Sequence, residues 1–172
     1  MKEKISCSFT GPRPQNLPWK SEDMQYIELL CIQLENAIRI AVEKGCRHFI
    51  SGMAIGVDLY AAQIVLKIRD QQPDLGITLE AAVPFPSQPN KWTEAQQMLY
   101  KAILNNVDKK TIIGQEATTE NFNKRNDYMV DNADIVIAVK PNKPGGTQRS
   151  IDYAIKNNKE VIIIDPMELM NG

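Results

Sequence analysis

The sequence is almost without histidine, since His48 is the only one among 172 residues. Metal sites built from several histidines are therefore excluded, and a histidine-based catalytic triad would depend on that single residue. The three cysteines, Cys7, Cys31 and Cys46, are odd in number and have no CxxC spacing. This pattern is typical of reduced thiols in a cytosolic protein and speaks against a disulfide framework.

Long apolar runs are missing as well, because no stretch approaches the roughly 20 residues needed to cross a bilayer. The N-terminal MKEKISCSFTG holds an apolar run that is too short for the core of a signal peptide. Neither sign of charge is in excess, since 20 basic residues face 21 acidic ones. No overall positive field draws the chain to nucleic acid or to an anionic membrane. We therefore expect a cytoplasmic protein with no membrane partner, and nucleic acid is disfavoured, although a local basic patch is compatible with this total.

The chain does contain a regular alternation of short apolar runs and amphipathic stretches, which is typical of βαβ units. Its 43% hydrophobic residues are enough to bury a core without disulfides or metal. The pattern predicts one domain over residues 1–172, a Rossmann-like, doubly wound α/β fold with a mainly parallel six-stranded sheet flanked by helices. The expected strands are residues 5–9, 48–51, 77–83, 110–113, 135–139 and 161–164. The first expected helix runs from Ser21 as N-cap to Gly45, and the second follows the loop at 52–58 and ends at about Arg69. The others cover residues 92–104, 122–131 and 147–157.

Ligands of doubly wound sheets bind at the carboxyl ends of the strands, near the point where the strand order reverses. Glycine and small polar residues follow several of the expected strands, so we expect them to share one edge of the sheet. The candidate ligand-binding residues at these strand ends are Thr10, Gly11, Arg13, Ser51, Gly52, Met53, Ala54, Gly56, Asp58, Pro84, Phe85, Gly145, Gly146 and Thr147.

Two of these loops, 52–56 and 145–147, open a helix with glycines. Bare backbone amides at a helix N-terminus suit phosphate or carboxylate oxygens. The alternative is that these glycines only satisfy a strand-to-helix turn. Neither loop matches GxGxxG or GxxxxGK[ST], so an ordinary dinucleotide fingerprint and a P-loop are both unsupported.

Five side chains of the expected site each have a structural alternative. Asp58 falls in the first turn of its helix, where it either stabilises the helix end or holds a ribose hydroxyl. Arg13, between two prolines, suits bidentate phosphate contact or is a surface arginine in a turn. Arg125 and Asn126, near the start of the helix expected over 122–131, reach the same edge or lie on a solvated helix face. Phe85 stacks on a base or belongs to the core.

Taken together, these segments resemble the SLOG superfamily, and within it the YpsA group. Residues 51–62 (SGMAIGVDLYAA) look like the SG-x-A-x-G-[IV]-D-x-x-A signature that this group shares with the DNA-processing protein DprA. Residues 10–14 (TGPRP) are similar to the group's TGHRP opening, with Pro12 where histidine is usual. Its second half is matched by Arg125-Asn126, Met129, Ala133-Asp134, Ile137-Ala138, Gly145-Gly146-Thr147 and Tyr153-Ala154.

The resemblance implies a Rossmann-like domain that binds nucleotides or nucleotide-derived ligands, such as NAD metabolites and ADP-ribose-like molecules, at its glycine-rich strand ends. Some relatives are enzymes and others are sensors. The LOG-type phosphoribohydrolases carry PGGxGTxxE, whose glutamate acts on an N-glycosidic bond. Here the run is PGGTQRSID, and matching Gly146-Thr147 to that GT pair places Ser150 where the glutamate stands. Asp152 would replace the glutamate only through a shift of register.

The sequence and its resemblance together predict a regulatory or sensor protein that binds a small nucleotide derivative, with no firmly expected cofactor or metal and no assigned catalytic residue. A hydrolase of nucleotide N-glycosidic or phosphate bonds that uses Asp58 or Asp152 is a second reading. A DprA-like binder of single-stranded DNA is a third, although that role needs a basic surface that this neutral chain lacks. A homo-oligomer is compatible with the apolar helix faces.

Overall fold

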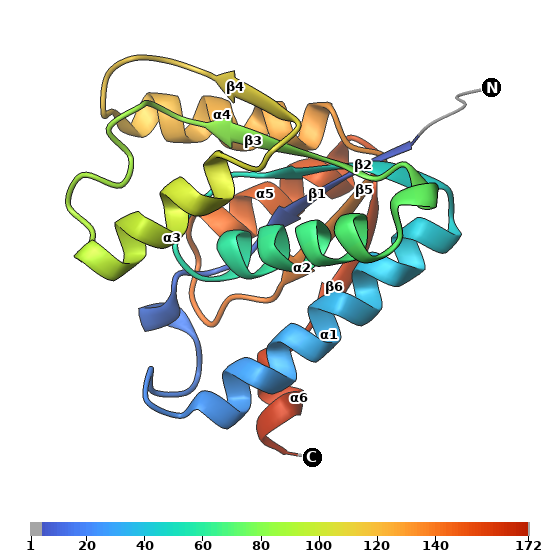
Figure 1. Cartoon of the computed structure of the whole chain (residues 1–172). Helices are drawn as coiled ribbons and strands as arrows, with labels where there is room; N and C mark the ends of the chain where they lie inside the picture. Colours follow the sequence, from blue (N-terminus) through green and yellow to red (C-terminus); the bar gives the residue numbers. More distant parts are fainter. Residues whose placement is uncertain (1–4, 172) are drawn as a thin grey trace.

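The computed structural model describes residues 5–171, which form a six-stranded sheet covered by helices (Figure 1). The strands are β1 (Ile5–Thr10), β2 (Cys46–Ser51), β3 (Thr78–Val83), β4 (Lys109–Ile112), β5 (Ile135–Val139) and β6 (Glu160–Ile164). Their order is β4-β3-β2-β1-β5-β6, and each neighbouring pair is parallel. The expected doubly wound, Rossmann-like sheet is confirmed, and these six strands are parallel throughout.

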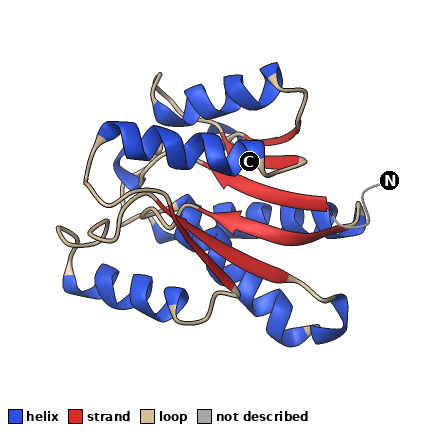
Figure 2. Ribbon diagram, turned by 90° about the horizontal axis from the view of Figure 1, so that it is seen from above, coloured by secondary structure: helices blue, strands red, loops and turns tan. Residues whose placement is uncertain are grey.

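Helices cover both faces of the sheet (Figure 2). On one face α1 (Met24–Glu43) packs against α2 (Val57–Gln71), α2 packs against α3 (Glu94–Leu104), and α6 (Pro166–Met170) packs against α1. The other face carries α4 (Thr119–Asp131) and α5 (Gly146–Lys156), which pack against each other. Right-handed crossovers place these two helices there because the chain changes direction across the sheet after β4. Short 3-10 turns lie at Pro14–Asn16 and Pro73–Leu75. Within residues 5–171 no helix is both long and apolar enough to span a membrane.

The larger part of the core lies between the sheet and α1 and α2. Leu30, Leu34 and Ile38 recur every four residues along α1 and are fully buried, and each contributes about 1.5–3 kcal/mol by leaving water. In the same core, the rings of Phe9 on β1 and Phe49 on β2 stack with centroids 6.1 Å apart. The opposite face has smaller apolar clusters, one of which joins α4 to β2 and β3. That face therefore leaves room for polar side chains between sheet and helix.

The starts of α1, α3, α4 and α5 differ from the expectation by one to three residues. Ser21 is not the N-cap of α1, which begins at Met24 with Asp23 in that place. The carboxylate of Asp23 accepts a hydrogen bond from the N–H of Lys20 at 3.3 Å, so residues 20–23 form a turn before the helix. Helix α4 begins at Thr119 rather than at residue 122, because the hydroxyl of Thr118 accepts the N–H of Asn121 at 3.1 Å and caps the helix. Arg125 therefore sits in the middle of α4 and not near its start.

The sheet has one switch point, between β1 and β5. From β1 the chain moves outward through β2 and β3 to β4, and it then returns to β5 on the other side of β1. Thr10 is paired with Ala138 where these two strands end. Because all strands run in the same direction, their carboxyl ends and the loops that follow meet at this edge, to which the strand arrows point in Figure 2. A ligand site is expected there.

Candidate functional site

A cavity of about 510 Å³ opens at the switch point. This volume is in the range of small-molecule binding sites. The walls come from the loops after β1 and β5, from the start of α2 and from one side of α4. The lining residues are Phe9, Thr10, Gly11, Pro12, Arg13, Gln15, Asn16, Ala54, Asp58, Thr119, Phe122, Asn123, Arg125, Asn126, Met129, Pro141, Lys143, Pro144, Gly145, Gly146 and Thr147.

Most of the candidates from the sequence meet in this one cavity. It is lined by Thr10, Gly11, Arg13, Ala54, Asp58, Arg125, Asn126, Gly145, Gly146 and Thr147. Four different segments of the chain thus bring their expected side chains to the same place. The binding roles of these residues stay predictions.

The other candidates lie outside the lining and support the loops behind it. They are Ser51, Gly52, Met53, Gly56, Pro84 and Phe85. The hydroxyl of Ser51 donates to the carbonyl of Asp58 at 2.9 Å and accepts the N–H of Met53 at 3.2 Å, which fixes the loop after β2. Gly56 has a φ of 97°, which favours glycine, and a Cβ there would lie 3.0 Å from Pro14 Cδ. Pro84 and Phe85 are buried at the end of β3.

Gly52 lies at the centre of a group of buried charges. Its carbonyl accepts a hydrogen bond from Nη1 of Arg125 at 2.5 Å and another from Nε2 of Gln88 at 3.2 Å. A Cβ on Gly52 would lie 2.7 Å from Oδ2 of Asp58 and 2.9 Å from Nη1 of Arg125. Glycine is therefore required here by the close approach of two charged side chains.

Asp58 and Arg125 are both deeply buried, with 9% and 5% of their surfaces exposed. Burial raises the pKa of Asp58, while the charge of Arg125, the N–H of Ala54 at 3.3 Å and the charge of Arg13 oppose that rise. Burial lowers the pKa of Arg125, and the charge of Asp58 acts in the opposite direction. A guanidinium keeps its proton at neutral pH. At the cavity floor the positive charge of Arg125 is therefore permanent, whereas Asp58 loses its proton less readily than an exposed aspartate.

The ring of Phe122 lines the cavity beside two guanidinium groups. The Cζ atoms of Arg13 and Arg125 are 5.9 and 5.7 Å from its centroid, within cation–π range. Phe85 supports the same ring edge-on, with centroids 4.9 Å apart. Arg13 is exposed, so its guanidinium is placed over an aromatic face and open to an anion in the cavity.

The N-terminus of α5 forms another part of the cavity wall. Gly146 is the first residue of this helix, and Gly145 before it provides no side-chain cap. The first N–H groups of a helix have no partner within the helix, so they are available to an anionic group. Lys143 is exposed in the same loop and also lines the cavity. Positive groups therefore approach the cavity from both sides.

Sequence reasoning missed several lining residues, above all Phe122, Gln15, Asn16, Asn123 and Lys143. The sequence predicts Phe122 and Asn123 at a helix start, whereas α4 begins at Thr119 and both residues follow its first three positions. The i to i+3 spacing of Phe122 and Arg125 indicates that these two side chains share one face of the helix. Gln15 and Asn16 belong to the 3-10 turn after Arg13, where the two neighbouring prolines are the only local signal of a turn. Ser150 is buried in α5, and neither it nor Asp152 lines the cavity. Residues 5–171 contain no group of three or more His, Cys, Asp or Glu side chains placed to hold a metal ion.

The fold and the position of the cavity place the protein among Rossmann-like α/β proteins with a site at the switch point. The family model YpsA, described as the YspA SLOG family, matches residues 7–169. The chain therefore belongs to this SLOG family, as its motifs indicate.

Individual relatives agree with this assignment. UPF0398 proteins of Bacillus thuringiensis (strain Al Hakam) and Bacillus cereus (strain AH187) are each 28% identical over 156 residues, which cover 90% of this chain and 84% of theirs. Among solved structures, DprA of Helicobacter pylori, described with a single-stranded DNA binding mode, aligns with a TM-score of 0.61 at 18% identity. DprA of Streptococcus pneumoniae aligns with a TM-score of 0.57 at 16% identity. The chain matches over 90% of its own length in both cases but spans only 65% and 50% of those chains, so the similarity is one of fold.

Proposed function

We propose that the protein binds a nucleotide or a nucleotide-derived ligand, of the ADP-ribose or NAD-metabolite kind, in the switch-point cavity and acts as a sensor or regulator. The observation that carries this proposal is the meeting, in one cavity, of the exposed Arg13, the buried and oppositely charged side chains of Asp58 and Arg125, and the N-terminus of α5, which has no side-chain cap. These are the groups that a phosphorylated, hydroxyl-bearing ligand needs.

Different residues of the cavity suit different parts of such a ligand. A phosphate or diphosphate lies at Gly145–Thr147, where helix amides meet Lys143, and Arg13 neutralises its charge from the other side. Asp58 is next to the cavity floor and accepts a ribose hydroxyl. Because the chain has no general excess of basic residues, selectivity for an anion depends on these few placed groups.

The test is binding by isothermal titration and thermal shift with a panel of ADP-ribose, NAD, AMP and cyclic nucleotides. A bound ligand raises the melting temperature in proportion to the logarithm of its concentration over Kd. Arg13→Ala is expected to weaken binding by about tenfold or more, since it removes a charge-assisted contact. It should leave stability within about 0.5 kcal/mol, because the side chain is exposed.

Arg39→Ala is the matched control. Arg39 is also a partly exposed arginine, but it pairs with Glu35 on α1, on the face away from α4 and α5. Its removal should not change ligand affinity. Absence of binding by every member of the panel, or equal affinity in wild type and Arg13→Ala, rejects the proposed function.

Hydrolysis of the bound ligand is a second candidate, favoured by one observation. Asp58 is a cavity carboxyl whose pKa is raised by burial, which is the usual condition of a general acid. Release of ribose phosphate or AMP from ADP-ribose by wild type but not by Asp58→Asn would establish it. Tight binding without turnover leaves the sensor, and affinity for single-stranded DNA that falls steeply with salt would instead favour a DprA-like role.

A further inference from the structure

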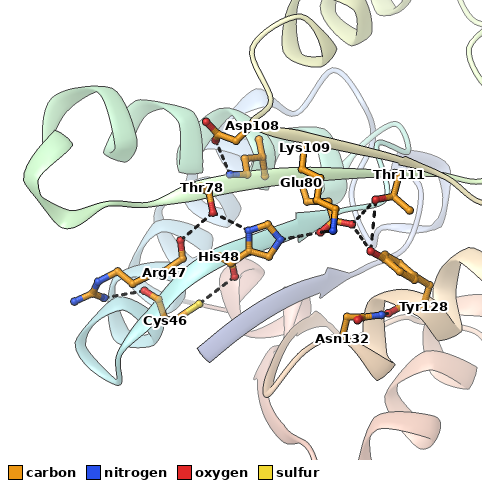
Figure 3. Close-up of polar contacts among 11 residues, drawn as sticks. Cys46, Arg47, His48, Thr78, Glu80, Asp108, Lys109, Thr111, Tyr128 and Asn132 are labelled. Carbon is orange, nitrogen blue, oxygen red and sulfur yellow. Dashed lines mark hydrogen bonds and ion pairs between the residues drawn. The ribbon is translucent and has the colours of Figure 1, made fainter. Parts of the chain in front are cut away.

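A buried carboxylate, Glu80, lies on β3, next to the edge strand β4 (Figure 3), and is outside the cavity lining. Only 2% of its surface is exposed. It accepts hydrogen bonds from Nε2 of His48 at 2.7 Å, from Oγ1 of Thr111 at 2.8 Å and from the hydroxyl of Tyr128 at 2.5 Å. Lys109 Nζ is 3.9 Å away. A carboxylate that accepts this many hydrogen bonds has its charge satisfied although it is buried.

The protonation of Glu80 agrees with this geometry. Burial alone would raise the pKa of Glu80, but the hydrogen bonds from His48, Tyr128 and Thr111 and the charge of Lys109 outweigh it and lower the pKa from 4.5 to about 2. Glu80 is therefore an anion at any ordinary pH. Each of its partners donates to a full charge, and such hydrogen bonds are stronger than those between neutral groups.

Tyr128 is the partner of Glu80 that comes from a helix, while His48, Thr111 and Lys109 come from β2 and β4. Tyr128 follows Arg125 by three residues on α4, so both side chains leave the helix on the side that faces the sheet. Arg125 reaches the carbonyl of Gly52 at the cavity floor. Two polar contacts one turn apart thus fix helix α4 to the sheet. Arg125 makes the one at the cavity, and Tyr128 makes the one to Glu80, outside the cavity lining.

The remaining contacts of α4 do not fix its position along the sheet as firmly. Met129 packs against Ile50 and Ala82 in a small apolar cluster, and apolar contact has no preferred direction. Toward α5, Asp127 pairs with Arg149 and Asp131 accepts the hydroxyl of Tyr153, but these contacts are exposed. Exposed pairs contribute little, about 0–1 kcal/mol. The contact between Tyr128 and Glu80 is directional and partly buried, and its acceptor Glu80 is only 2% exposed.

We infer that Tyr128 and Glu80 are positioning residues for the cavity: their hydrogen bond sets the placement of α4 and, through it, the placement of Arg125, Phe122 and Asn126 at the ligand. The effect on ligand affinity rests on the proposed function, whereas the effect on Arg125 does not.

The experiment is Tyr128→Phe, which removes one hydroxyl and keeps the ring. The first readout is the Nε–H signal of Arg125 in ¹⁵N-labelled protein, because Nε donates to Oδ1 of Asn126 at 2.9 Å and reports the geometry of the site directly. We expect this signal to shift or broaden. The second readout is the affinity for ADP-ribose, expected to fall about three- to tenfold, the size of effects carried through packed networks.

Two control variants separate positioning from stability. Tyr153→Phe removes the same hydroxyl from a comparable contact to α4, at 2.7 Å from Asp131 but exposed, and should change neither readout. Thr111→Val removes another hydrogen bond to Glu80 and the long 3.5 Å contact between the Tyr128 hydroxyl and Thr111, but it keeps the 2.5 Å hydrogen bond from Tyr128 to Glu80. It should lower stability while changing the Arg125 signal and the affinity less than Tyr128→Phe does.

An unchanged Arg125 signal in folded Tyr128→Phe overturns the inference, and so does a Thr111→Val variant that alters signal and affinity as much as Tyr128→Phe. A shifted Arg125 signal in a protein that binds no ADP-ribose supports the positioning role and rejects the ADP-ribose form of the proposed function.

Discussion

Replacing Gly52 by alanine is a sharp test of the buried charges behind the cavity. The added Cβ would lie 2.7 Å from Oδ2 of Asp58 and 2.9 Å from Nη1 of Arg125, whereas ordinary contacts begin at about 3.4 Å. One of the two charged groups must move, and Arg125 cannot move without weakening its hydrogen bond to the Gly52 carbonyl. Overpacking costs about 1–3 kcal/mol, and a weakened hydrogen bond to a buried charge costs about as much again.

We therefore expect Gly52→Ala to lower the free energy of unfolding by about 2–6 kcal/mol. The assay is urea unfolding followed by circular dichroism, with the midpoint and the slope compared between variants. Gly145→Ala is the matched control, because a Cβ at Gly145 meets nothing within 4 Å and the residue has an extended φ of 167°. Its stability should stay within about 1 kcal/mol of wild type. A Gly52→Ala protein with the wild-type midpoint and slope would refute the close approach.

Two further predictions concern Glu80 and Phe122. The lowered pKa of Glu80 gives stability that is present above pH 4.5 and lost as the pH falls toward about 2, a difference of roughly 3 kcal/mol. The gap in unfolding free energy between wild type and Glu80→Gln should therefore narrow between pH 5 and pH 2.5, and a gap independent of pH would contradict the assignment. Phe122→Leu keeps an apolar side chain but loses the ring under Arg13 and Arg125, so urea unfolding should show a loss of about 1–2 kcal/mol. Phe122→Tyr keeps the ring and should lose little, and equal losses in the two variants would exclude a contribution from the guanidinium contacts.

Much of the fold follows from local patterns in the sequence. The run 135–139 was expected as a strand and is β5 with the same bounds, because consecutive buried apolar residues are typical of a parallel strand covered on both faces. Other elements differ by a few residues where side-chain caps decide the boundary. At α4 the polar stretch before Phe122 resembled a loop, and the cap provided by Thr118 extends the helix backward over it.

The cavity was predictable where its residues follow strands, as Thr10 and Asp58 do, because parallel strands bring their ends to one edge. It was not predictable where residues meet across long separations. Gln88 donates to the carbonyl of Gly52 from 36 residues away, and Glu80 is satisfied by His48, Thr111 and Tyr128. In the sequence Glu80 is one acid in an apolar strand. The partners that make it tolerable in the core depend on strand register and helix placement, which no local pattern encodes.

The switch point also determines how the proposed ligand would affect the molecule as a whole. The cavity wall on one side comes from the residues after β1 and β2, and on the other side from α4 and the loop after β5. These belong to the two halves of the chain, which the sheet joins through the pairing of β1 with β5. A molecule bound between them would add a further connection across that seam, beside the contacts of α4 with Gly52, Glu80, Ile50 and Ala82. Its binding free energy would appear as slower amide exchange in both halves together, so that occupancy makes their opening more cooperative.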